Sequence, residues 1–225
     1  MIERSARRGV LGRQIINIHR EGSEAILQVV EAGWKLASTF PSAHAGAGEV
    51  EITECLRDGM RAALEERGTD WSKNMTVLPG TESRSSPDVP RPDGRTDVPI
   101  FFSDVREEYN EHDPHAIVEC KRVAGNRAEL CREYVVEGVD RFVTSKYARN
   151  HAVGFMVGYL LSGDAGSAVA AINAHLTRKR RQSEHLGPCL IGDRSWARSS
   201  RHARAAPADP IALHHAFVDL RPTPS

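Results

Sequence analysis

Two short apolar segments, residues 94–102 and 116–122, constrain this chain more than any other feature. Each is typical of a β-strand with charged residues in it: Asp97 in the first segment, Glu119 and Lys121 in the second. Alternate side chains of a strand share a face, so Glu119 and Lys121 project together. An acid and an amine at the end of an apolar strand are costly to bury without a purpose. We therefore expect these strands to be neighbours and their charged residues to form one site.

Two carboxylates from neighbouring strands suit a hard divalent cation. Magnesium prefers oxygen ligands in octahedral geometry, and one or two carboxylates plus a substrate phosphate usually hold it. We predict Asp97 and Glu119 as metal ligands, with Mg²⁺ as the cation, Mn²⁺ as a substitute and the Cys120 carbonyl as a further ligand. Lys121 would orient the attacking water and offset negative charge in the transition state. This arrangement is typical of phosphodiester hydrolysis.

The two segments resemble strands of the PD-(D/E)XK nuclease superfamily, which includes restriction endonucleases and many phage-defence nucleases. Residues 94–98 are similar to its Gly-Arg-hydrophobic-Asp-hydrophobic strand, and residues 117–122 to its hydrophobic-hydrophobic-Glu-x-Lys strand. The pairs Pro87-Asp88 and Pro92-Asp93 also match the family's name, but we interpret both as loop residues, with Asp93 as an alternative ligand. Pro99 departs from the pattern because it cannot donate a ladder hydrogen bond, which predicts an edge strand or a bulge.

The resemblance implies the fold, the activity and the partners. The implied fold is α/β: a three-layer α/β/α, restriction-endonuclease-like sandwich around a central mixed sheet of four or five strands. The implied activity is Mg²⁺-dependent endonuclease cleavage of DNA, in restriction or anti-phage defence. The implied partners are DNA and either a second copy of the chain or a partner protein of a defence system.

A helix is predicted over residues 48–64, where the apolar residues recur at helical spacing: Ile52, Leu56, Met60 and Ala63. In many members of the superfamily a glutamate of the first core helix reaches towards the metal. Glu49 lies on the apolar stripe, whereas Glu51 and Glu54 rotate away, so Glu49 is our choice for a third catalytic carboxylate. The alternative is structural, because acids near a helix N-terminus oppose the macrodipole.

Later segments predict the helices and strands that cover the site. The expected elements are a helix from Arg127 capped by Asn126 and ended by Gly138, a buried strand over 151–161, a helix capped by Asp164, and a final strand over 211–220 that closes the sheet.

Basic residues of the second half are candidate contacts for nucleic acid. The candidates are Arg178, Lys179, Arg180, Arg181 and Arg201. A run of like charges suits a phosphate-facing patch, but it also suits a solvated helix end. Arg201 belongs to a segment, 200–204, that we interpret as a polar loop, with contact to a nucleic-acid backbone as the alternative. Arg141 would contact phosphate or form an ion pair with Glu137 or Asp140.

Charge and length agree with one enzyme domain over residues 1–225. The formal net charge is zero, but residues 1–119 hold 14 basic and 21 acidic residues, and residues 120–225 hold 16 and 9. A polarised molecule can bind phosphate locally without being basic overall. Proline, glycine and serine predict an exposed loop around 79–95. With no bilayer-spanning apolar run and no signal-peptide pattern, we expect a cytoplasmic protein that does not bind membranes.

Other interpretations of the same residues remain open. One alternative keeps the same catalytic residues but changes the substrate to RNA or structured DNA. A catalytically degenerate nuclease fold would act as a subunit that binds nucleic acid or a partner. A Glu-x-Lys triplet also occurs as a solvated ion pair on unrelated strands, and a structure with Asp97 far from Glu119 would favour that interpretation.

Overall fold

The structure is a computed structural model, and it describes most of the chain between residues 18 and 220. The described ranges are 18–67, 73–83, 94–103, 114–192, 194–206 and 208–220. The pairs Pro87-Asp88 and Pro92-Asp93, and with them the alternative ligand Asp93, lie outside these ranges. The described residues form an α/β protein, as predicted.

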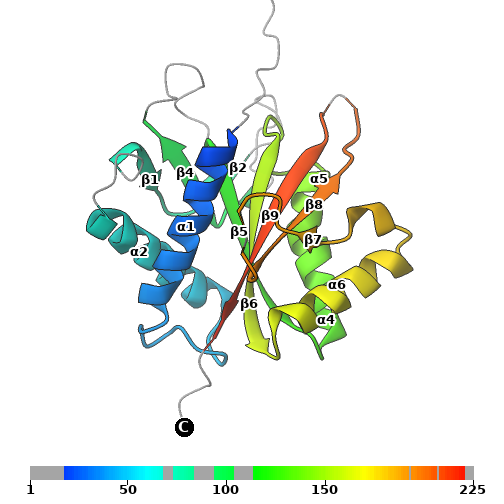
Figure 1. Cartoon of the computed structure of the whole chain (residues 1–225), viewed down its shortest axis with the longest axis horizontal. Coiled ribbons are helices and arrows are strands. Elements are labelled where there is room, and N and C mark those ends of the chain that lie inside the picture. The colour runs from blue at the N-terminus through cyan, green and yellow to red at the C-terminus, as the bar shows by residue number, and fades with distance from the viewer. Residues whose placement is uncertain are drawn as a thin grey trace, which may run out of the picture.

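One mixed sheet of seven strands organises the molecule (Figure 1). In spatial order, the strands are β1 (Met75–Val77), β4 (Val98–Phe102), β5 (Ala116–Ala124), β6 (Val153–Ser162), β9 (Ile211–Asp219), β8 (Ala197–His202) and β7 (Gly187–Pro188). The central strands β5, β6 and β9 are parallel to one another, and the other neighbours are antiparallel. The mixed character was predicted. The sheet is wider than the four or five strands expected, and β9 lies inside it rather than closing it.

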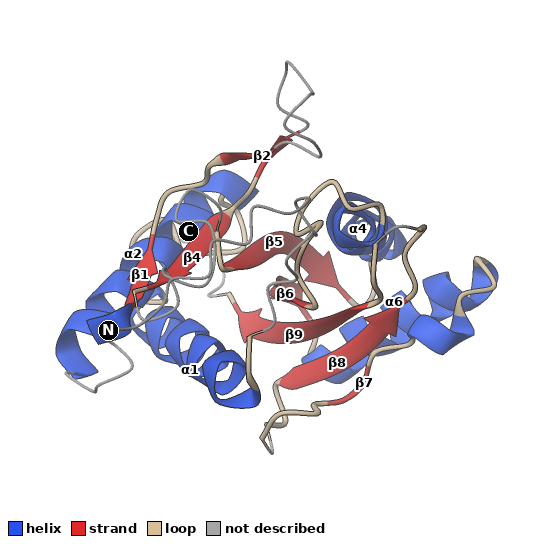
Figure 2. Ribbon diagram, turned by 90° about the horizontal axis from the view of Figure 1, so that it is seen from above, coloured by secondary structure: helices blue, strands red, loops and turns tan. Residues whose placement is uncertain are grey.

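Helices cover both faces of the sheet (Figure 2). One face carries α1 (Arg20–Ala37) and α2 (Glu49–Arg67), and the other carries α4 (Ala128–Tyr134), α5 (Asp140–Val143) and α6 (Ala165–Arg178). α2 is the helix predicted over 48–64, and its predicted apolar stripe is buried. No helix was predicted over α1. Among the described residues, none of the helices combines the length and the apolar character that crossing a bilayer requires.

The alternation of strand side chains separates two apolar cores. On β5, Val118 and Cys120 join the cluster that contains α1 and α2, whereas Ile117 and Val123 join the cluster on the opposite face. β6, the strand predicted over 151–161, is buried on both faces, as is usual for a parallel strand inside a sheet. Charged residues on β5 therefore have apolar neighbours above and below the sheet.

Pro99 lies in an interior strand, so the predicted edge position is wrong. β4 pairs with β1 on one side and with β5 on the other, and Pro99 lies opposite Ile117 in the β5 ladder without a bulge. The Pro99 carbonyl accepts a hydrogen bond from the N–H of Leu78, just past the end of β1. The N–H that proline lacks would point to this same side, where the β1 ladder has already ended.

The helix after β5 begins without the predicted cap. Arg127 occupies the N-cap position and makes no capping hydrogen bond with its side chain. Asn126 instead accepts a hydrogen bond from the Ser162 hydroxyl at 3.1 Å, which ties the turn to the end of β6. The cap predicted for α6 is confirmed: the Asp164 carboxylate accepts from the N–H of Ser167 at 2.8 Å in a capping box.

Gly138 does not end a helix, contrary to the prediction. It lies in a π-helical turn, Val135–Val139, that leads directly into α5. A Cβ at Gly138 would lie 2.6 Å from Met156 Cε and 3.3 Å from Lys121 Cγ. The glycine therefore lets this turn approach the sheet closely, and π-turns of this kind often occur at functional sites.

The segment 79–95 is not entirely a loop. Its described ends form a short antiparallel ladder between β2 (Glu82–Ser83) and β3 (Gly94–Arg95). This ladder ends two residues before Asp97 and so fixes the approach of the chain to that residue.

Residues 200–202 lie in β8 rather than in a polar loop. Ser200 and His202 are 4% and 1% exposed, and the Ser200 hydroxyl lies 2.6 Å from His202 Nε2 and 2.7 Å from His215 Nε2. His215 Nδ1 pairs with the Tyr134 hydroxyl at 2.9 Å, and His202 Nδ1 pairs with Glu184. We call these five residues the histidine–serine cluster. The polar residues predict a loop, but contacts with His215 of β9, Tyr134 of α4 and Glu184 satisfy these groups in the interior of the protein.

Candidate active site

The predicted site residues meet where β4 and β5 stop pairing. The ladder ends with Val98 opposite Val118. Asp97 immediately precedes Val98 and Glu119 immediately follows Val118, so both lie just past this end of the antiparallel ladder. Beyond this point, Asp97 Oδ2 accepts a hydrogen bond of 2.7 Å from the N–H of Cys120. The carboxylate takes the place of a strand carbonyl, which holds Asp97 against β5. The structure therefore places Asp97 beside Glu119.

Glu49 reaches the same point from the first residue of α2. Its Oε1 lies 2.9 Å from Lys121 Nζ, and its Oε2 accepts a hydrogen bond of 3.1 Å from the N–H of Arg122. The N–H groups of Cys120 and Arg122 thus each donate to a carboxylate where the β4 ladder is missing. Glu54 turns away, as predicted, and pairs with Arg57.

Lys121 lies among three carboxylates. Its Nζ is 2.9 Å from Glu49, 3.0 Å from Glu119 and 3.9 Å from Asp97, and it donates to the Cys120 carbonyl at 2.8 Å. Burial alone would lower the pKa of Lys121, but the three carboxylates outweigh it and hold the pKa above the ordinary value. The ammonium is therefore charged. We call Glu49, Asp97, Glu119 and Lys121 the carboxylate–lysine cluster.

Glu119 is the most deeply buried member of the cluster, with a side chain that is 0% exposed. Its Oε1 contacts Lys121 and Arg141, while its Oε2 is buried and has no hydrogen-bond partner among the described residues. Burial, and secondarily the charge of Asp97, raises the pKa of Glu119 to about 8 against the opposing effect of the two cations. Burial also raises the pKa of Asp97, although Lys121 opposes it. The three carboxylates of the site outnumber its two cations, Lys121 and Arg141.

Arg141 supports Glu119 from α5. Its Nη1 lies 2.6 Å from Glu119 Oε1 and 3.1 Å from the Tyr147 hydroxyl, and its Nη2 lies 3.6 Å from Glu137. The pairing with Glu137 was one of the alternatives from the sequence, but the shorter pairing with Glu119 was missed. No sequence spacing signals it, because the π-turn before α5 sets the direction of Arg141.

The cluster offers oxygen atoms to a hard cation. Glu119 Oε2 has no partner within the described ranges, and Asp97 is held through Oδ2, which leaves Oδ1 as a potential ligand. In the described part of the chain, no three side chains of His, Cys, Asp or Glu already surround a common metal position. Lys121 provides a reason, because its ammonium lies between the acids and binds the Cys120 carbonyl that was predicted as a ligand.

The predicted phosphate-binding residues divide into two groups. Arg178, Lys179, Arg180 and Arg201 are exposed. Arg181 forms ion pairs of 2.7 Å with both Asp140 and Glu184, so a phosphate would have to compete with two carboxylates. Phosphate binding by the four exposed residues stays a prediction.

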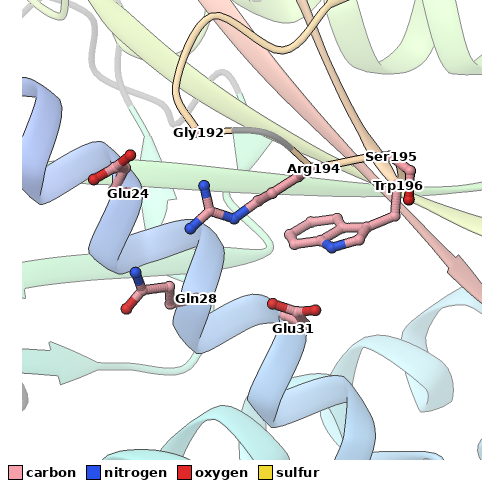
Figure 3. Close-up of a pocket in the computed structure, with 7 residues that line it drawn as sticks. All are labelled: Glu24, Gln28, Glu31, Gly192, Arg194, Ser195 and Trp196. Atoms are coloured by element: carbon pink, nitrogen blue, oxygen red, sulfur yellow. The ribbon is translucent and has the colours of Figure 1, made fainter.

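A separate hollow of about 440 Å³ lies between α1 and the segment before β8 (Figure 3). It is lined on one side by Glu24, Gln28 and Glu31 and on the other by Arg194, Ser195 and Trp196. The Arg194 guanidinium points towards α1, and its Nη1 also donates to the Ile191 carbonyl at 3.1 Å. The carboxylate–lysine cluster contributes no side chain to this hollow.

The cluster has the features expected of a functional site. Strongly perturbed acids beside a specific charge partner mark such sites more often than chance, although structural ion pairs also shift pKa values. No family model, curated protein or solved structure matches the chain. The distinguishing observation is the buried oxygen of Glu119, which has no partner in the described part of the chain, because a purely structural network would pair it. The arrangement can bind a cation and position a water or a phosphate beside it.

Proposed function

We propose that this protein is a metal-dependent endonuclease that hydrolyses phosphodiester bonds in DNA. The observation that carries the proposal is the convergence of Glu49, Asp97 and Glu119 on Lys121 at the point where β4 and β5 separate. An acid set around one amine suits the stabilisation of a phosphoryl transition state. We extend the proposal to the PD-(D/E)XK superfamily and to restriction or anti-phage defence in the cytoplasm, with a second copy or a defence partner completing the assembly.

The arrangement of the helices supports the three-layer fold of this proposal. α1 and α2 lie on one face of the sheet, and α4 and α6 lie on the other, with a separate apolar core on each face. The acids of the cluster come from α2, from the residue just before β4 and from β5, as the resemblance implies. Fold likeness alone does not establish an activity, so the proposal depends on the site.

Asp97 and Glu119 would hold Mg²⁺, or Mn²⁺ in its place. Both residues supply carboxylate oxygens, the ligand type that Mg²⁺ prefers, and Glu119 Oε2 is buried without another partner in the described residues. The chemistry that a bound cation supplies is a lower pKa for water and charge neutralisation on the phosphate. Binding would also favour the ionised form of Glu119, whose pKa burial has raised.

Lys121 would orient the attacking water and offset the charge that develops on the phosphate. Glu49 keeps the ammonium in place through Oε1 and fixes the backbone of β5 through Oε2. Arg141 holds Glu119 in one orientation from the other side. The catalytic roles therefore fall on Lys121 and the acids, and Arg141 is a positioning residue.

Cleavage of supercoiled plasmid DNA tests the proposal. Purified protein is incubated with Mg²⁺, with Mn²⁺ or with EDTA, beside the variant Lys121→Ala and the matched control Lys35→Ala, an exposed lysine of α1. We expect nicking or linearisation with either metal, none with EDTA, severe loss in Lys121→Ala and no loss in the control. Cleavage by Lys121→Ala at the parent rate would show that the assigned mechanism is wrong.

A further inference from the structure

Arg122 lies next to the carboxylate–lysine cluster and differs from the other cations there. Lys121 and Arg141 are both committed to carboxylates. The Arg122 side chain forms no hydrogen bond or ion pair with any described residue, and its Nε is buried without a partner. A buried donor that stays unpaired costs free energy, which a purely structural arginine would avoid. This guanidinium is therefore available to a ligand.

The position of Arg122 follows from the strand on which it lies. On β5, Cys120 points to the face covered by α2 and is fully buried, and Arg122 points to the same face but is only partly buried. Its backbone N–H donates a hydrogen bond to the carboxylate of Glu49, the first residue of α2. In the parallel ladder it lies opposite Tyr159, whose hydroxyl bonds to Thr53 of α2. Arg122 thus lies beside the start of α2, towards the end of β5.

Among the chemistries available, an anion with several oxygens fits this guanidinium best. Its planar fork of N–H donors matches phosphate, and carboxyl ends of parallel strands are where ligands bind in α/β sheets. The cluster itself is rich in acids and would repel a nucleic-acid backbone, so a cation that is not already neutralised is needed to hold the substrate. Resting on the nuclease function proposed above, we propose that Arg122 binds a backbone phosphate of the DNA next to the bond that is cut.

The test compares binding with cleavage in matched variants. The affinity for a short fluorescent DNA duplex is measured by anisotropy in Ca²⁺ over a series of salt concentrations, and plasmid cleavage is measured in Mg²⁺. The variants are Arg122→Met, Arg122→Lys and the control Arg20→Met, which changes an exposed arginine at the start of α1. Thermal unfolding of each variant and Mn²⁺ binding are recorded in parallel.

We expect Arg122→Met to bind DNA about tenfold more weakly, to reduce the salt slope by about one and to raise KM more than it lowers kcat. Arg122→Lys should restore part of the affinity, because it keeps the charge and loses the fork. Arg20→Met should match the parent. Mn²⁺ binding should be unchanged, and the unfolding temperature of Arg122→Met should be equal or higher, because an unpaired buried donor has been removed.

The outcomes separate this inference from the nuclease function. If the parent cuts DNA and Arg122→Met binds and cuts equally well, the inference is overturned and the nuclease stands. If the parent binds DNA through Arg122 but never cuts it, the inference stands and the proposed activity is wrong. If the parent binds no DNA at all, or if Arg122→Met loses affinity only because its unfolding temperature falls, the inference is overturned.

Discussion

The carboxylate–lysine cluster and the histidine–serine cluster are both buried polar networks on the same sheet, yet they are balanced differently. In the histidine–serine cluster, every ring nitrogen of His202 and His215 has a partner. Burial lowers the pKa of both histidines, so they are neutral at physiological pH. In the carboxylate–lysine cluster, burial raises the pKa of Glu119 to about 8, and one of its oxygens has no partner among the described residues.

The difference teaches how to distinguish a polar network that supports the fold from one that is open to a ligand. Ser200, His202 and Glu184 have the chain of contacts of a hydrolytic triad, but Ser200 is buried and shares its hydroxyl with a second histidine. A fully satisfied network of this kind rigidifies a core, whereas a partly satisfied one carries a free-energy cost. A ligand that pairs with the unsatisfied groups of the carboxylate–lysine cluster would therefore remove that cost.

The largest expected effect comes from removing a carboxylate of the unsatisfied cluster. Asp97→Asn and Glu119→Gln keep the shape of the side chains but remove the charge that would hold the cation. We expect plasmid cleavage to fall by about three orders of magnitude, since a metal ion contributes several kcal/mol to stabilising the transition state.

The matched control for this loss is Glu184→Gln in the histidine–serine cluster. It also neutralises a partly buried carboxylate, so it should lower the free energy of unfolding while cleavage stays close to the parent rate. Cleavage by Asp97→Asn or Glu119→Gln within tenfold of the parent would remove the functional contrast between the clusters.

The next largest effect is on the pH dependence of metal binding. Below a pKa of about 8, the Glu119 carboxyl of the metal-free protein is protonated, and the proton competes with the cation. Affinity for Mn²⁺ should therefore fall about tenfold for each pH unit below 8 and level off above it. Titration calorimetry in buffers of different ionisation enthalpy measures both the affinity and the proton released.

Glu119→Gln should bind Mn²⁺ weakly with little dependence on pH in this range. The histidines of the other cluster are not proposed ligands of the cation and should give no such signal. An affinity for Mn²⁺ in the parent that is constant between pH 6 and pH 8 would contradict the assignment of Glu119.

Much of the cluster could be predicted because local rules place its members. The two-residue period of a strand puts Glu119 and Lys121 on one face, and the helical period puts Glu49 on the apolar stripe of α2. The pairing of β4 with β5 brings Asp97 to the same point. These relations need only the pattern of the sequence and one correct pair of strands.

What could not be predicted depends on contacts between distant segments. Arg141 reaches Glu119 only because a π-turn at Gly138 packs against Met156, and no local pattern marks that turn. The sequence predicts a loop at Ser200 and His202, because polar residues are usually exposed. Their burial depends on His215, which is contributed by a neighbouring strand.

A smaller effect, on stability alone, is expected in the histidine–serine cluster. Ser200→Ala removes the hydroxyl between His202 Nε2 and His215 Nε2 and leaves two buried ring nitrogens without a partner. The free energy of unfolding should fall by about 2 kcal/mol, which urea denaturation measures, while metal-dependent cleavage is unchanged. Ser195→Ala, at an exposed serine, is the control. Loss of cleavage in a folded Ser200→Ala protein would give the histidine–serine cluster a catalytic role, and the two clusters would no longer differ in function.

The smallest effect is expected where the π-turn touches the catalytic strand. In Gly138→Ala, the new Cβ would lie 2.6 Å from Met156 Cε and 3.3 Å from Lys121 Cγ, so both flexible side chains must shift. Helix propensity favours alanine by up to about 1 kcal/mol and should offset the crowding, so the unfolding temperature should change little. Cleavage should fall about threefold, because Lys121 is displaced from its place among the acids. Adding Met156→Leu, which removes the nearest atom, should restore part of the rate. A single variant that cuts at the full parent rate would show that the ammonium tolerates the shift and that the π-turn serves only to direct Arg141.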